Sequence, residues 1–136
     1  MKFRTLFKAV FSFAIIALVM DYLMTVYSFA VLSHHYETNP LIRSLIWTGV
    51  DPFVSLSVIF LATLALILIA IDAAMPWLDA EPYSGDLHHV GRYMLTAKER
   101  RTARDVAMFG CLALATYIMV DHILGFLSWL PLLQYL

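Results

Sequence analysis

Four side chains of this sequence are of the types that hold protons or cations: the carboxylates Asp21, Glu37 and Asp121 and the imidazole of His122. Carboxylate and imidazole groups together can bind a divalent metal ion or pass a proton from one group to the next. Asp21, Asp121 and His122 lie inside long apolar stretches, where an ionisable group is costly unless it is paired, neutralised or in contact with water. These four residues are therefore the candidate catalytic and metal-binding residues.

The spacing of the candidates does not identify a cofactor. No two of them follow a metal motif such as His-x-x-x-His, and the adjacent His34 and His35 could only add to the group. No segment resembles a nucleotide-binding loop, a nucleophile elbow or a haem attachment site. A divalent metal is thus a suggestion from residue types alone.

The elements that must position these residues are transmembrane helices. The chain has 136 residues, room for one domain, and 62% of them are hydrophobic, with a mean hydropathy of +0.79, which is far above that of a soluble domain. Three apolar segments, at about 9–32, 52–75 and 106–127, can each cross a roughly 30 Å hydrocarbon core. We expect an all-α integral membrane protein, a single membrane domain over 1–136. The net charge of −1 gives no reason to expect a nucleic acid partner.

The basic residues predict the orientation of the spans. Three bases precede the first span, and five lie between the second and third: Lys2, Arg4 and Lys8, then Arg92, Lys98, Arg100, Arg101 and Arg104. The positive-inside rule puts both clusters in the cytoplasm, so the N-terminus and the loop 76–104 are expected inside and the C-terminus outside the cell membrane. The first apolar run is longer than the core of a signal peptide, and we expect it to be uncleaved.

This topology also sorts the candidate residues by side. All four, Asp21, Glu37, Asp121 and His122, fall in the outer half of the protein. Asp86, His88 and His89 fall on the cytoplasmic side. The two groups of histidines therefore cannot serve one site.

Capping residues in the loops predict three helix starts. Asn39 before Pro40 and Asp51 before Pro52 each place a capping side chain ahead of a proline at the first helical position. The first predicts a short interfacial helix at about 40–48 in the outer loop, and the second begins span two. Thr96 and Glu99 have the spacing of a capping box, which predicts a helix that starts near Ala97 and continues into span three.

Two helix faces predict contacts between helices. Asp21, Thr25 and Ser28 share one face of span one, which should point toward protein. In span three, small residues at intervals of four, with Gly110 beside them, allow another helix to approach closely: Ala107, Cys111 and Ala115. The expected partners are membrane lipid and other transmembrane helices.

Part of this pattern resembles a known family. An aspartate and a threonine four residues apart, followed by Glu-x-Asn-Pro and a second span, resemble small prokaryotic multi-span membrane proteins of unknown function. The matching residues, all in the first half of the chain, are Asp21, Thr25, Glu37, Asn39 and Pro40. The resemblance implies the same topology and marks Thr25, Asn39 and Pro40 as motif residues, but it brings no activity. A lysine that is common in the family's second span has no counterpart here.

Three functions follow as expectations. The first is a non-catalytic membrane protein that acts as an oligomerising or accessory (assembly) subunit of a larger complex, because small-residue faces mark helix packing. The alternative is a membrane-embedded metal-assisted or acid–base enzyme, a hydrolase or transferase with an outer-leaflet site. A second alternative is an ion- or proton-conducting oligomer with Asp21 lining the path. Asp21 also has a purely structural interpretation, a hydrogen bond that fixes helix packing.

Overall fold

Three long helices make up most of the protein: α1 (Phe3–Val31), α3 (Pro52–Ala74) and α5 (Ala103–Trp129). The computed structural model describes residues 1–32, 37–96 and 102–131, and within these ranges the chain contains helices and no strand. All three long helices are apolar and long enough to cross a membrane. The predicted all-α, multi-pass fold is confirmed.

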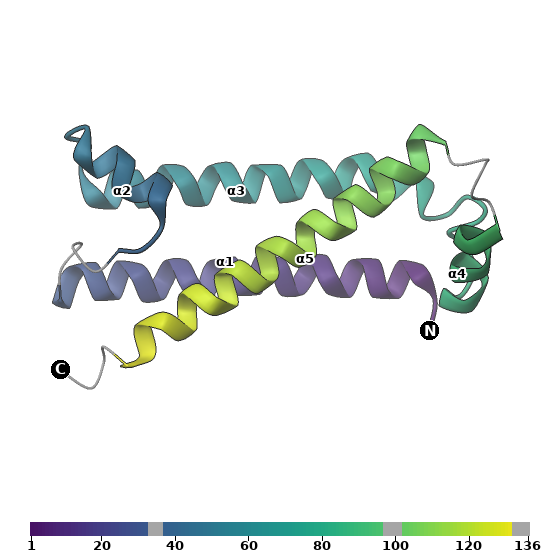
Figure 1. Ribbon diagram of the computed structural model, residues 1–136, viewed down its shortest axis with the longest axis horizontal. Helices are drawn as coiled ribbons and strands as arrows, with labels where there is room; N and C mark the ends of the chain where they lie inside the picture. The colour runs from purple at the N-terminus through teal and green to yellow at the C-terminus, as the bar shows by residue number, and fades with distance from the viewer. Residues whose placement is uncertain (33–36, 97–101, 132–136) are drawn as a thin grey trace.

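The long helices do not pack equally with one another (Figure 1). α1 and α3 run side by side, and α5 crosses them obliquely; its contact with α1 is the most extensive in the bundle. α5 starts near the last turn of α3 and ends near the last turn of α1, so α3 and α5 diverge. We call the end toward which they diverge the α2 end, because it carries the short helix α2 (Pro40–Trp47). The opposite, N-terminal end carries the 3₁₀ turn η2 (Met75–Trp77) and α4 (Leu87–Thr96).

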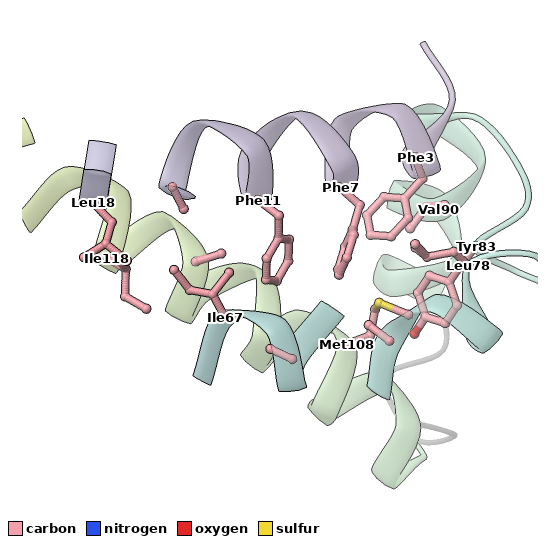
Figure 2. Packing of buried hydrophobic residues seen from close by; sticks show 14 residues of the cluster. Phe3, Phe7, Phe11, Leu18, Ile67, Leu78, Tyr83, Val90, Met108 and Ile118 are labelled. Atoms are coloured by element: carbon pink, nitrogen blue, oxygen red, sulfur yellow. The ribbon is translucent and has the colours of Figure 1, made fainter. Parts of the chain in front are cut away.

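The half of the bundle nearer the N-terminal end is filled by an apolar core (Figure 2). Phe3, Phe7 and Phe11 repeat every four residues, so they share one face of α1, and all three are buried. Residues from the other helices complete the cluster, among them Ile67, Met108, Ala115 and Ile118. Van der Waals packing of these side chains holds α1, α3 and α5 together in this half of the bundle.

Two of the predicted helix starts are confirmed. The Asn39 side chain accepts hydrogen bonds from the backbone N–H groups of Leu41 (3.0 Å) and Ile42 (3.4 Å) at the start of α2. The Asp51 side chain does the same for the first turn of α3. Gly49, with a φ of +89°, turns the chain between the two helices, a conformation that favours glycine.

The third predicted start is wrong. Thr96 ends α4, a helix that the sequence analysis did not anticipate, and its hydroxyl donates to the carbonyl oxygen of Arg92 (2.9 Å). α5 begins instead at Ala103, where a second capping box with the same spacing joins Thr102 and Asp105. Ala97 and Glu99 lie outside the described residues.

Asp105 has partners that explain why this second box is used. Its buried carboxylate accepts from the backbone N–H (2.8 Å) and hydroxyl (2.9 Å) of Thr102 and from the hydroxyls of Tyr83 and Tyr93. Burial, and then the hydrogen bond to Asp105, raise the pKa of Tyr83, so its hydroxyl stays protonated as a donor. This network closes the N-terminal end of the bundle.

Candidate functional site

The centre of the candidate site is a contact between Asp21 of α1 and His122 of α5. Asp21 Oδ2 lies 2.7 Å from His122 Nδ1, and both side chains are largely buried, at 18% and 14% exposure. Gly125 makes this approach possible, because a Cβ at that position would lie 2.8 Å from Asp21 Oδ1. The carboxylate therefore rests directly against the backbone of α5.

The next turn of the same interface carries a second polar contact. Thr25 Oγ1 accepts a hydrogen bond of 3.1 Å from Trp129 Nε1, and both residues are buried. Ser28, one turn further along α1, is also buried, so the predicted inward face of Asp21, Thr25 and Ser28 is confirmed. Trp129 is the last residue of α5, and its burial agrees with the hydrogen bond that its indole N–H makes there.

Glu37 approaches the site from the segment that leads into α2. Only 6% of the residue is exposed, and its Oε1 accepts a hydrogen bond of 2.6 Å from the backbone N–H of Asn39. Burial, with a smaller contribution from the charge of Asp21, raises the pKa of Glu37 even though that hydrogen bond acts in the opposite direction.

These residues line two adjoining spaces at the α2 end. Asp21, Glu37, His122, Tyr22 and Thr25 line an inner cavity of about 40 Å³. A groove of about 510 Å³ follows between α3 and α5, where the two helices diverge. The two spaces share part of their lining: Asp21, Asn39, Ile59, Thr63 and His122.

The structure thus brings three of the four predicted site residues to one cavity. Asp121 lines only the groove, on an exposed position of α5 one residue before His122. His34 and His35 lie outside the described residues. In the part of the chain that the structure describes, no group of three or more histidine, cysteine or acidic side chains is arranged to hold a metal ion. His88 and His89 lie on α4, at the N-terminal end.

The geometry of the pair suits proton transfer. An aspartate bound to Nδ1 of a histidine orients the ring and leaves Nε2 for a second partner. His122 Nε2 makes no hydrogen bond within the described residues, so it can accept a proton from a bound molecule or donate one to it. The site can therefore exchange a proton or bind a donor group.

The sequence analysis missed three residues that build the site. Gly125 is an isolated glycine within an apolar helix, and small residues in membrane helices are a signal for the close approach of another group. Trp129 carries an indole N–H, which needs a partner when buried. The hydroxyl of Tyr22 lies 3.2 Å from that of Ser57 and links α1 to α3, but nothing in the local sequence indicated this contact.

The fold and site together define a three-span helical membrane protein with a polar site at one end of the bundle. No family model matches the chain, and neither a curated protein nor a solved structure is significantly similar to it. The resemblance seen in the first half of the sequence has no family-model match to support it.

Proposed function

We propose that this chain is a non-catalytic subunit of the cell membrane, with a cytoplasmic N-terminus, that binds a transmembrane helix of another subunit through α5. The partner is a second copy or a component of a larger complex. One observation carries the proposal: a continuous exposed seam along α5, hereafter the α5 seam.

The α5 seam has the spacing of a helix–helix contact. Its eight residues alternate at intervals of four and three, the repeat of a coiled-coil seam, and all are exposed: Ala103, Ala107, Gly110, Leu114, Tyr117, Asp121, Leu124 and Ser128. The three nearest the N-terminal end are small, which lets helix backbones approach closely. A Cβ at Gly110 would meet nothing within 4 Å, so the fold of a single chain does not require a glycine there.

The other end of the α5 seam carries polar groups that lipid does not solvate. Tyr117 is 67% exposed, and Asp121 and Ser128 are exposed beside it. Asp121 precedes the end of α5 by eight residues, about 12 Å along the helix. A carboxylate at that depth needs a protein partner or water, and a docked helix supplies such a surface.

The proposed orientation agrees with the arrangement of the helices. The N-terminus and the connection between α3 and α5 lie at the same end of the bundle (Figure 1). Both basic clusters of the sequence belong to these segments, so the positive-inside rule assigns them to one membrane side, the cytoplasm.

A bulky substitution in the small-residue part of the α5 seam tests association through it. We expect Gly110→Leu to weaken association roughly tenfold or more, because helix contacts of this kind depend on small residues. Ala65→Leu, an exposed position of α3, is the matched control and should leave association unchanged. Native mass spectrometry from nanodiscs measures the species present. A wild-type chain that purifies as a monomer, with no other protein bound, contradicts the proposal.

A second candidate, an acid–base hydrolase or transferase, is favoured by the contact between Asp21 and His122. His122 would act as the base, Asp21 would orient it, and Glu37 would serve as a proton donor. Fluorogenic lipid esters offered to the protein in nanodiscs test this candidate. Turnover by the wild type that His122→Gln abolishes supports it, whereas a wild type without turnover counts against it.

The apolar core restricts where a path for ions or protons could run. Between the site and the N-terminal end, the buried residues of the bundle are apolar, among them Phe7, Phe11, Leu18 and Ile67. A path for ions or protons would therefore have to run between copies of the chain. Proteoliposome flux that Asp21→Asn leaves unchanged would dismiss this alternative.

A further inference from the structure

A second groove, hereafter the Lys8 groove, lies between α1 and α3, which run side by side (Figure 1). Its volume is about 240 Å³, and it lies in the half of the bundle nearer the N-terminal end. Lys8 and Ser12 are its polar lining residues, and the others are apolar: Phe7, Phe11, Ile15, Ile71 and Met75. None of these residues belongs to α5, so the Lys8 groove is separate from the α5 seam.

The polarity of the Lys8 groove changes along α1. Lys8, Ser12 and Ile15 follow one another at intervals of four and three, so they share one face of the helix. At about 1.5 Å per residue, Ile15 lies about 10 Å further along the helix axis than Lys8. The groove therefore has its charge at the end nearer the N-terminus and only hydroxyl and apolar groups beyond it.

The length of α1 places Lys8 at the boundary of the hydrocarbon core. The 29 residues of α1 extend about 43 Å, which exceeds a roughly 30 Å core by about 13 Å. With the helix centred in the core, each boundary lies about 6 to 7 Å from a helix end. Lys8 lies about 7.5 Å from Phe3, the first residue of α1. A lysine at this level extends its ammonium group toward the lipid phosphates while its stem stays on apolar surface.

No acidic side chain forms an ion pair with Lys8 in the part of the chain that the structure describes. Lys8 is exposed and has neither a hydrogen bond nor an ion pair there. Arg4, one turn nearer the N-terminus, is paired with Asp79. Asp72 follows Ile71 on α3 but does not line the groove. The Lys8 groove thus combines one positive charge with an apolar interior.

We propose that the Lys8 groove binds one acyl chain of an anionic phospholipid, whose phosphate group contacts the Lys8 ammonium. The groove is smaller than the roughly 300–1,000 Å³ typical of small-molecule pockets, and it suits a slender hydrocarbon chain. An anionic headgroup keeps the negative charge of its phosphate for Lys8, whereas the choline of a zwitterionic headgroup offsets that charge. In the proposed orientation this end faces the cytoplasm, whose leaflet carries anionic lipids. The lipid site does not depend on the helix partner proposed for the α5 seam.

Two lipids with the same chains test the selection by charge. The full-length protein is placed in nanodiscs with equal amounts of dioleoyl phosphatidylglycerol and dioleoyl phosphatidylcholine, and native mass spectrometry identifies the lipids that it retains. We expect an about fivefold preference for phosphatidylglycerol, the effect of one basic residue close to an anionic headgroup. Equal retention of the two lipids overturns the proposal.

Two charge variants locate the preference. Lys8→Gln removes the charge at the groove and should lower the preference for phosphatidylglycerol to less than roughly twofold. Arg92→Gln, at an exposed position of α4 outside the groove, is the matched control and should keep the preference of the wild type. A preference that survives Lys8→Gln, or that both variants lose equally, arises from the other positive charges and rejects the proposal.

Ser12→Phe tests the place of the acyl chain. The added ring fills the groove at an exposed position and leaves Lys8 in place, so we expect the amount of retained phosphatidylglycerol to fall several-fold. Ala65→Phe, at an exposed position of α3 outside the groove, should retain as much as the wild type. Glycerol phosphate, the headgroup without its chains, should not displace the lipid. Displacement by glycerol phosphate, or unchanged retention by Ser12→Phe, shows that the groove does not hold the chain and rejects the proposal.

Discussion

Asp21 links the structural and the chemical interpretations of the site. Its contact with His122 joins α1 to α5, as expected of polar groups between transmembrane helices. The same contact fixes the orientation of the His122 imidazole. Asp21 also lines the cavity that Glu37 lines. A packing role and a ligand-binding role are therefore compatible at this residue.

Gly125→Ala tests the close approach of Asp21 to α5. The added methyl group would lie 2.8 Å from the Asp21 carboxylate, which must move and weaken its contact with His122. We expect a loss of about 1 kcal/mol in the free energy of unfolding, since the weakened charge-assisted hydrogen bond outweighs the gain in helix propensity. Unfolding of the protein in mixed micelles by SDS measures it. Gly91→Ala, where a Cβ meets nothing within 4 Å, should be neutral or stabilising; equal effects of the two substitutions would refute the explanation.

The raised pKa of Glu37 predicts how stability depends on pH. A carboxyl group whose pKa is higher in the folded state than its ordinary value of 4.5 binds its proton more tightly when the protein is folded. Its contribution is therefore fully present below 4.5 and is lost as the pH rises through the raised value. Glu37→Gln keeps an acceptor for Asn39 without the charge, so its advantage over the wild type should grow as the pH rises above 4.5. Melting temperatures of the two proteins across this range measure the difference; parallel curves would contradict it.

At the scale of elements, α5 presents different residues to different surroundings. One face packs on α1 through His122 and Trp129, and the α5 seam is exposed along the helix, with its last four residues lining the groove between α3 and α5. The first turn is fixed by Asp105, which the Tyr83 and Tyr93 hydroxyls reach from the preceding segment. The start of the helix is thus decided by contacts outside the helix.

Asp105→Asn should loosen the N-terminal end of the bundle. The substitution removes the negative charge that accepts hydrogen bonds from two tyrosines and from Thr102, and we expect a cost of about 2 to 3 kcal/mol. Hydrogen exchange should rise in α4 and in the first turn of α5 more than in α3. Asp72→Asn serves as the control, since Asp72 is exposed; exchange as slow as in the wild type would show that the network does not hold this end.

At the scale of the whole molecule, the two ends of the bundle differ. The N-terminal end is closed by aromatic packing and by the Asp105 network, as Figure 2 shows for the aromatic part. The α2 end is opened by the divergence of α3 from α5, and the cavity and groove occur there. The polar site therefore lies at one end of the bundle and not at the other.

The orientation of the molecule is tested by labelling exposed residues at each end. In a Cys111→Ser background, Trp47→Cys on α2 and Leu95→Cys on α4 replace side chains that are 79% and 84% exposed. A membrane-impermeant maleimide added to intact cells should label the first and not the second, because the positive-inside rule predicts that the α4 end faces the cytoplasm. Labelling of Leu95→Cys alone would show that the orientation is the opposite of the predicted one.

The sequence by itself determined the three spans and the short helix α2. Hydropathy located the three spans, and Asn39 and Asp51 marked the starts of α2 and α3, because both signals depend on residues close together in the chain. The inward face of Asp21, Thr25 and Ser28 followed from helical spacing for the same reason. The capping box predicted at Thr96 showed where local signals are insufficient, because α5 starts after the later box of Thr102 and Asp105.

Only the tertiary structure decided which box starts a helix and which candidates meet. The partners of Asp105 come from Tyr83 and Tyr93, and those of Asp21 from a helix about 100 residues away. Such contacts depend on the crossing of α5 over α1, which no local pattern specifies. The crossing brought His122 to Asp21 and left Asp121, its neighbour in sequence, on the exposed α5 seam, because adjacent residues of a helix point about 100° apart.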